Sequence, residues 1–201
     1  MEMADDALHI ENEVLALAYA PGKSGRVGEP LGGKVALQKV LYHLRRSLPH
    51  HIPSADMPHF YGPFDEQVEF AAEQLESSGY LEIEEVGRIA LTERGMKEAK
   101  EVWERELPLR EKEALQRLKE FFSDLSVDEI LAITYAQYPE SATDSLVADR
   151  IQRIGKRLAI GLVQRGKISV DLGAKISGMG LKDFLLELSR RNIPVVERDS
   201  Q

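Results

Sequence analysis

The sequence predicts a mostly α-helical fold with one β-hairpin, and three features of the 201-residue chain lead to this expectation. In most segments, apolar side chains recur every three or four residues, as they do on the buried face of an α-helix. Clusters of proline and glycine separate these segments. Two short runs, 81–84 and 88–91, instead alternate apolar and polar residues around a turn, which favours an antiparallel hairpin.

Three helices are expected before the hairpin. They cover residues 6–20, 35–48 and about 65–78. Asp65 is a suitable N-cap for the third helix, Gly79 a suitable C′ residue, and Thr92 caps a further helix after the hairpin. Three helices followed by two short strands is the order of a winged helix-turn-helix, in which the hairpin covers the apolar side that the helices leave open. We expect this domain to occupy residues 1–95.

A helical connector is expected over residues 96–145. Pro108 interrupts the charged helical stretch, and Ser126 with Glu129 forms a capping box at the start of another helix. A narrow apolar seam runs between them, formed by Leu115, Leu118, Phe121 and Phe122. Such a seam packs on its own domain or on a second subunit, and we expect it to support a homodimer. Residues 139–145 are polar and are predicted to form a linker.

The remaining residues, 146–201, are predicted to form a three-helix domain. A long helix covers 146–165, and Ser169 caps a short helix that ends in a turn at 177–179. The last helix, 180–191, has an apolar face formed by Leu181, Phe184, Leu185 and Leu188. A short helix, a glycine turn and an amphipathic helix together have the pattern of a helix-turn-helix.

Charge is distributed unevenly along the chain. The net charge is −8, yet residues 146–201 carry 11 basic and six acidic side chains. The cations expected to contact nucleic acid are Arg150, Arg153, Lys156, Arg157, Lys175, Lys182, Arg190 and Arg191. Three of these arginines recur at i, i+3 and i+7 on one helical face, a spacing that suits phosphate contacts, although a solvated surface has the same appearance. The helix after Asp65 has four glutamates and no Lys or Arg, and should repel DNA.

Catalytic and metal chemistry find little support. The absence of cysteine excludes disulfides, thiol catalysis and cysteine-ligated metals. Residues 28–35 resemble a phosphate-binding loop, but Val35 lacks the required hydroxyl group. A proline-rich loop brings together His50, His51, Asp56 and His59, whose spacing matches no known zinc finger. We therefore expect a protein that is not an enzyme and has no metal or cofactor. A hydrolase that uses the histidines of this loop is an alternative.

The sequence also predicts a cytoplasmic protein without membrane contact. Its first residues are acidic and lack the basic segment of a secretory signal. No apolar run approaches the roughly 18 residues that a transmembrane helix needs.

The N-terminal half resembles the YwgA-like winged-helix proteins of archaea and bacteria. The motifs that carry the resemblance are LQKVLY at 37–42, FYGPFDE at 60–66, LESSGYL at 75–81 and LTERG at 91–95. The stretch LAITYAQYPE at 131–140 is also similar to the helix that follows in those proteins. The resemblance implies the winged-helix fold and a loose link to regulation, and it supplies no catalytic residue.

The last fifty or so residues resemble a different family, the short prokaryotic antitoxins encoded beside PIN-domain toxins. The motifs are GKIS at 166–169, AKISGM at 174–179, FL at 184–185 and NIPV at 192–195. That family usually caps its last helix with Ser or Thr, where this chain has Gly180. The resemblance implies a module that binds DNA or a partner protein.

These observations lead to a prediction of function. We expect a non-enzymatic transcriptional regulator or antitoxin-like protein whose basic C-terminal module, 146–201, contacts DNA. The alternative is an adaptor that binds a toxin-like protein through the same helices and binds no DNA.

Overall fold

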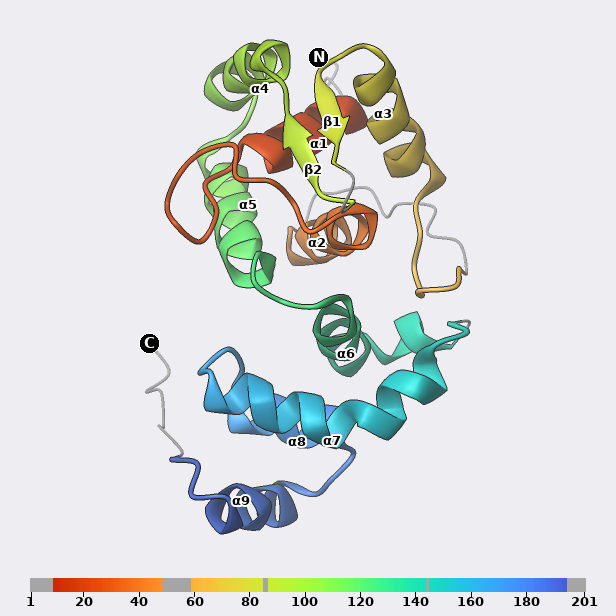
Figure 1. Ribbon diagram of the computed structural model, residues 1–201, viewed down its shortest axis with the longest axis vertical. Coiled ribbons are helices and arrows are strands. Elements are labelled where there is room, and N and C mark those ends of the chain that lie inside the picture. Colours follow the sequence, from red (N-terminus) through yellow and green to blue (C-terminus); the bar gives the residue numbers. More distant parts are fainter. Residues whose placement is uncertain (1–8, 49–58, 85–86, 144, 195–201) are drawn as a thin grey trace, which may run out of the picture. The chain divides into compact units, whose positions relative to one another are not determined.

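The computed structural model describes residues 9–48, 59–84, 87–143 and 145–194. Within these ranges the chain forms nine α-helices, one short 3-10 helix and a two-stranded antiparallel hairpin (Figure 1). The mostly α-helical prediction is thereby confirmed. The chain divides into two compact units, one of residues 1–57 and 63–125 and the other of 58–62 and 126–201.

The described residues of the first unit form five helices and the hairpin. They are α1 (Ile10–Tyr19), α2 (Lys34–Ser47), α3 (Glu66–Ser77), β1 (Leu81–Ile83), β2 (Ile89–Leu91), α4 (Glu93–Arg105) and α5 (Leu109–Phe122). The hairpin follows α3 as predicted, and this order is consistent with a winged-helix-like element. The expected caps are present, because Asp65 accepts a hydrogen bond from the backbone of Gln67 and Thr92 accepts one from Gly95.

The hairpin has a regular register and one additional neighbour. Leu81 pairs with Leu91, and Ile83 pairs with Ile89. Leu31, in the predicted loop before α2, exchanges two backbone hydrogen bonds with Ile89, of 2.8 and 3.1 Å. The loop before α2 is therefore bound to the hairpin, a contact that the sequence did not indicate.

The core of this unit centres on α1 and α2. Val14, Leu17, Leu37 and Leu41 are fully buried. Helix α5 packs on both helices.

The apolar seam of α5 contributes to that core. Leu115 and Phe122 are buried, and the other two members of the seam are half-buried. The seam thus serves its own unit, and a homodimer through it stays a prediction.

In the second unit, the residues that the structure describes form four α-helices and the 3-10 helix. They are α6 (Val127–Gln137), η1 (Pro139–Ala142), α7 (Ala148–Gln164), α8 (Val170–Ser177) and α9 (Leu181–Arg190). The capping box that starts α6 is confirmed. The predicted linker instead contains η1. The hydroxyl of Ser145 contacts the hydroxyl of Tyr135 at 2.7 Å and donates to the carbonyl of Phe60 at 3.1 Å, which ties residues 59–62 to this unit.

The predicted three-part division of the chain at residues 95 and 145 stays a prediction. The segment 96–145 is shared between the two units, because α5 lies in the first, and α6 with η1 lies in the second.

Helices α8 and α9 are joined by a short turn. Ser169 caps α8 by accepting a hydrogen bond from the backbone of Leu172, and Gly178 ends that helix with a left-handed φ of 68°. Gly180 is the N-cap residue of α9 and has no side chain. No side-chain hydrogen bond therefore caps the backbone amides at the start of that helix. Phe184 and Leu188 anchor α9 to the rest of the unit and are fully buried.

A glycine sets the distance between α7 and α8. A Cβ atom added at Gly155 would lie 2.3 Å from the carbonyl oxygen of Ile176, whereas one at Gly161 of the same helix would meet nothing within 4 Å. We expect Gly155→Ala to destabilise the second unit by about 1–3 kcal/mol through overpacking. The matched Gly161→Ala should stabilise it by up to about 1 kcal/mol through helix propensity.

Hydrogen exchange of the α8 amides in the full chain measures both changes. Protection should fall in Gly155→Ala and hold or rise in Gly161→Ala. Equal effects of the two substitutions would contradict the close approach of α7 and α8.

No helix in the described ranges is long and apolar enough to cross a membrane.

Candidate functional site

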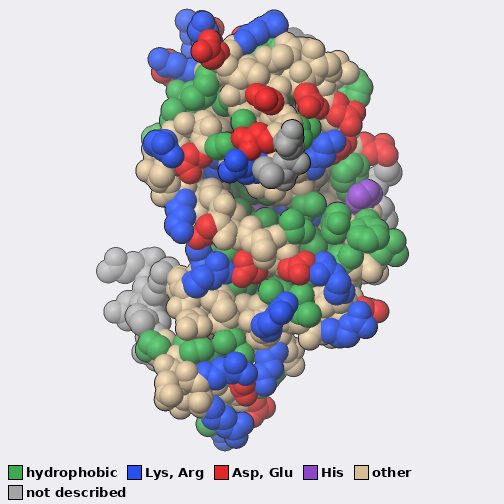
Figure 2. Space-filling model, viewed as in Figure 1, with side chains coloured by type: hydrophobic (Ala, Val, Ile, Leu, Met, Phe, Trp, Pro, Cys, Tyr) green, Lys and Arg blue, Asp and Glu red, His purple; other side chains and the backbone are tan. Residues whose placement is uncertain are grey.

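The cations predicted to bind nucleic acid lie on three helices of the second unit. Helix α7 carries Arg150, Arg153, Lys156 and Arg157, α8 carries Lys175, α9 carries Lys182 and Arg190, and Arg191 follows α9. All of these side chains are exposed. Figure 2 shows Lys and Arg side chains on the visible face of this unit, interspersed with apolar ones rather than gathered into one patch.

Among the described residues, carboxylates of the same unit pair with three of the eight cations. Arg150 forms a bidentate pair with Asp128 of α6, with distances of 2.7 and 2.9 Å. Hydrogen bonding to Asp128 is the main reason that the pKa of Arg150 is raised. Glu187 of α9 binds both Arg191, at 2.8 Å, and Lys156, at 3.1 Å. These two cations, Arg191 foremost, lower the pKa of Glu187.

The other five cations are available to a ligand. They are Arg153, Arg157, Lys175, Lys182 and Arg190, and none forms an ion pair within the described ranges. Arg153 and Arg157 are one helical turn apart on the outer face of α7, whose opposite face packs on α6 and α8. The cationic surface is therefore smaller than the sequence predicts.

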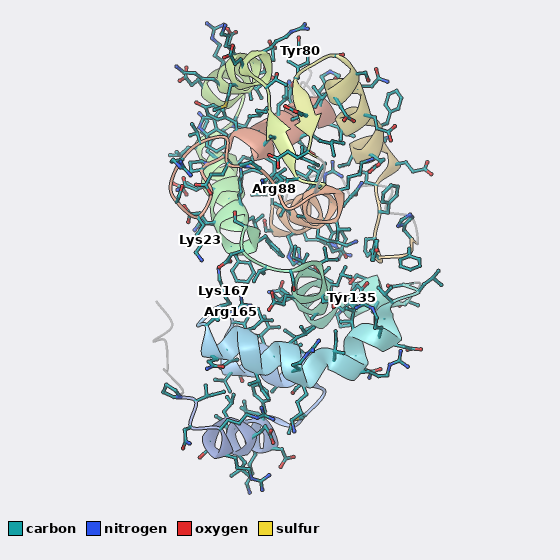
Figure 3. All side chains as sticks on the ribbon, in the orientation of Figure 1. Lys23, Tyr80, Arg88, Tyr135, Arg165 and Lys167 are labelled. Carbon is teal, nitrogen blue, oxygen red and sulfur yellow. The ribbon has the colours of Figure 1, made fainter. Side chains whose placement is uncertain are left out.

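The second unit is also less basic than its last three helices indicate. Its residues, 58–62 and 126–201, hold 11 basic and 10 acidic side chains. Glu129 of α6 pairs with Arg165, which follows α7 and is labelled in Figure 3, at 2.5 Å. Carboxylates of α6 thus offset part of the charge that the sequence assigns to a separate basic domain.

Helix α9 presents apolar side chains outward, contrary to its predicted face. Phe184 and Leu188 are buried as expected, but Leu181 and Leu185 are 45% and 38% exposed. Leu186 is 50% exposed, and sequence reasoning did not single it out. The signal was present, because the apolar residues of α9 span a wider arc than one buried face can cover.

The structure offers little support for the two alternative sites, the histidine loop and the stretch that resembles a phosphate-binding loop. His50, His51 and Asp56 lie outside the described residues, and His59 is exposed. No group of three potential metal ligands occurs in the ranges that the structure describes. The stretch that resembles a phosphate-binding loop enters α2, where Lys34 pairs with Glu69 and Glu73 of α3. The hydrogen bond that the Lys34 ammonium group donates to Glu69 is the main cause that raises the pKa of Lys34.

No family model, curated protein or solved structure matches the chain.

Proposed function

We propose that the chain is a non-enzymatic regulator whose second unit binds duplex DNA. The observation that carries this proposal is the pair Arg153 and Arg157, exposed one turn apart on α7 without a carboxylate partner in the described ranges. Lys175 and Lys182 flank the turn between α8 and α9. This arrangement suits a helix-turn-helix that is positioned on the phosphate backbone.

The resemblances of both halves support the same class of protein. The first unit would be the winged helix, and its acidic α3 would contact protein rather than DNA. The second unit would be the antitoxin-like module. Few side chains at the start of α9 suit base reading, so binding should depend strongly on salt and weakly on sequence.

The test reverses two charges. Arg153→Glu with Arg157→Glu should weaken binding of the full chain to mixed-sequence duplex DNA by at least about tenfold. The plot of log affinity against log salt should become less steep, its negative slope shrinking in magnitude by about 2, because two phosphate contacts are lost. Fluorescence anisotropy at two ionic strengths measures both quantities.

A matched control separates this site from the net charge. Arg110→Glu with Arg117→Glu makes the same charge change on the exposed face of α5 in the first unit. DNA affinity should change little in that variant. An equal loss in both variants, or no loss in the first, would overturn the proposed site.

The exposed leucines of α9 favour a second candidate, an adaptor that binds a toxin-like protein and no DNA. Three exposed leucines in ten residues are typical of a protein contact. Such a complex should survive high salt, whereas DNA binding through the cations should not. The double substitution Leu181→Ser with Leu186→Ser should abolish the protein complex.

A further inference from the structure

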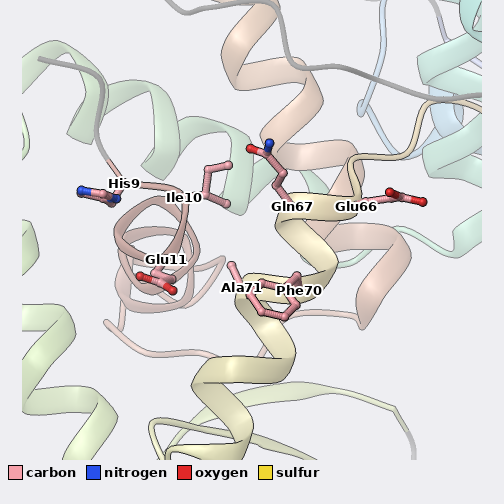
Figure 4. Close-up of a pocket in the computed structure, with 7 residues that line it drawn as sticks. All are labelled: His9, Ile10, Glu11, Glu66, Gln67, Phe70 and Ala71. Carbon is pink, nitrogen blue, oxygen red and sulfur yellow. The ribbon is translucent and has the colours of Figure 1, made fainter. Parts of the chain in front are cut away.

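The first unit has a surface groove where the start of α1 meets α3. It encloses about 430 Å³ and is lined by His9, Ile10, Glu11, Glu66, Gln67, Phe70 and Ala71 (Figure 4). Its base is apolar, and Phe70 is 60% exposed. An aromatic side chain left in water beside a hollow is the kind of feature that a partner covers.

The rim of this groove is acidic. Glu11 and Glu66 are exposed, and neither has an ion-pair partner within the described ranges. Helix α3 has no Lys or Arg. The eight residues that precede His9 include three carboxylates and no Lys or Arg, so their charge does not complement the groove. The groove therefore fits an occupant that is both apolar and cationic.

Helix α9 has this complementary chemistry. Its exposed leucines stand next to Lys182 and Arg190, which have no ion-pair partner in the part of the chain that the structure describes. The acidic, apolar groove and the cationic, apolar helix therefore complement each other in charge and in hydrophobic surface.

We propose that α9 of one copy of this chain binds in the α1–α3 groove of a second copy. The leucines of α9 would cover Phe70, and Lys182 and Arg190 would neutralise Glu11 and Glu66. A single contact of this size gives weak association, whereas two reciprocal contacts close a two-fold dimer. This association needs no DNA, and DNA would compete with it for the cations of α9.

The test follows the mass of the full chain by sedimentation equilibrium without DNA. The natural chain should self-associate as its concentration rises, and more weakly at high salt. Glu11→Lys with Glu66→Lys, or Lys182→Glu with Arg190→Glu, should each raise the dissociation constant at least about tenfold. Phe70→Ala should also weaken association, whereas Leu109→Ala, at another exposed apolar residue of the same unit, should not.

Mixing the two charge-reversed chains gives the sharpest result. In a mixed dimer, the unchanged groove of one chain meets the unchanged α9 of the other, and the charge-reversed groove meets the charge-reversed α9. Opposite charges therefore face each other in both contacts, and association should return. Failure of the mixture to associate would overturn the proposal, as would a natural chain that is monomeric at all concentrations. An equal effect of Glu98→Lys, on the exposed face of α4, would also overturn it. Loss of DNA binding would leave these outcomes unchanged, so the two proposals fail separately.

Discussion

Arg45→Met is expected to lower the free energy of unfolding of the first unit by about 3–5 kcal/mol. The guanidinium group of Arg45 joins three helices, because it donates to Glu13 of α1 at 2.6 and 3.2 Å and to Asp65, the N-cap of α3, at 2.5 Å. The Arg45 side chain is only 9% exposed, and both carboxylates are buried. Methionine retains the apolar stem but leaves two buried negative charges without their guanidinium group.

Urea unfolding monitored by Trp103 measures this loss. Trp103 is the only tryptophan of the chain and lies on α4, beside Tyr19, so its fluorescence reports on the first unit. Arg105→Met is the matched control. Arg105 forms an exposed pair with Glu101 at 3.4 Å, and its loss should change the free energy of unfolding by less than about 0.5 kcal/mol.

A triple variant identifies the cause of the loss. Adding Glu13→Gln and Asp65→Asn to Arg45→Met should recover part of the stability, because the buried negative charges are removed and asparagine still caps a helix. If the triple variant is less stable than Arg45→Met alone, the penalty does not come from the unpaired carboxylates.

The elements that sequence predicted well are those fixed by neighbouring residues. Asp65, Thr92, Ser126 and Ser169 each cap the helix that was expected to begin there. A cap requires only a hydroxyl or carboxylate within three residues of a free backbone amide. The hairpin has the same local character, because its alternation and its turn lie within eleven residues.

The candidate site was only partly predictable, because it depends on distant partners. The arginine stripe of α7 is visible in sequence, but the partner of Arg150 is Asp128, 22 residues earlier. The outward leucines of α9 show the same limit. Which arc of a broadly apolar helix is buried depends on the neighbouring α8, and the helix sequence alone does not determine it.

A buried lysine gives the first unit a pH-dependent stability. Lys119 of α5 is 1% exposed, and its ammonium group donates to the carbonyl oxygen of Ala18 at 2.6 Å. Burial lowers the pKa of Lys119 from 10.5 to about 7, although the charge of Glu29 opposes this shift. The unfolded chain therefore binds more protons than the folded chain between about pH 7 and pH 10.5.

The sign of the effect follows from this difference. The cost of burying the charged lysine is fully present below pH 7 and is relieved as pH rises towards 10.5. Stability should increase by up to about 1.4 kcal/mol per pH unit in this range. At pH 7, Lys119→Met should gain a few kcal/mol of stability (about 5 at most), because the buried charge is removed. The unpaired carbonyl group of Ala18 should reduce this gain by about 1–3 kcal/mol.

The slope is a better measure than the absolute stability, because other groups titrate in the same range. Urea unfolding monitored by Trp103 at several values between pH 7 and pH 10 should give a smaller slope for Lys119→Met than for the natural chain. Lys100→Met, at an exposed lysine of α4 that pairs with Glu104 at 3.7 Å, should leave the slope unchanged. Parallel curves for the natural chain and Lys119→Met would mean that Lys119 reaches water in the folded protein and keeps its ordinary affinity for a proton.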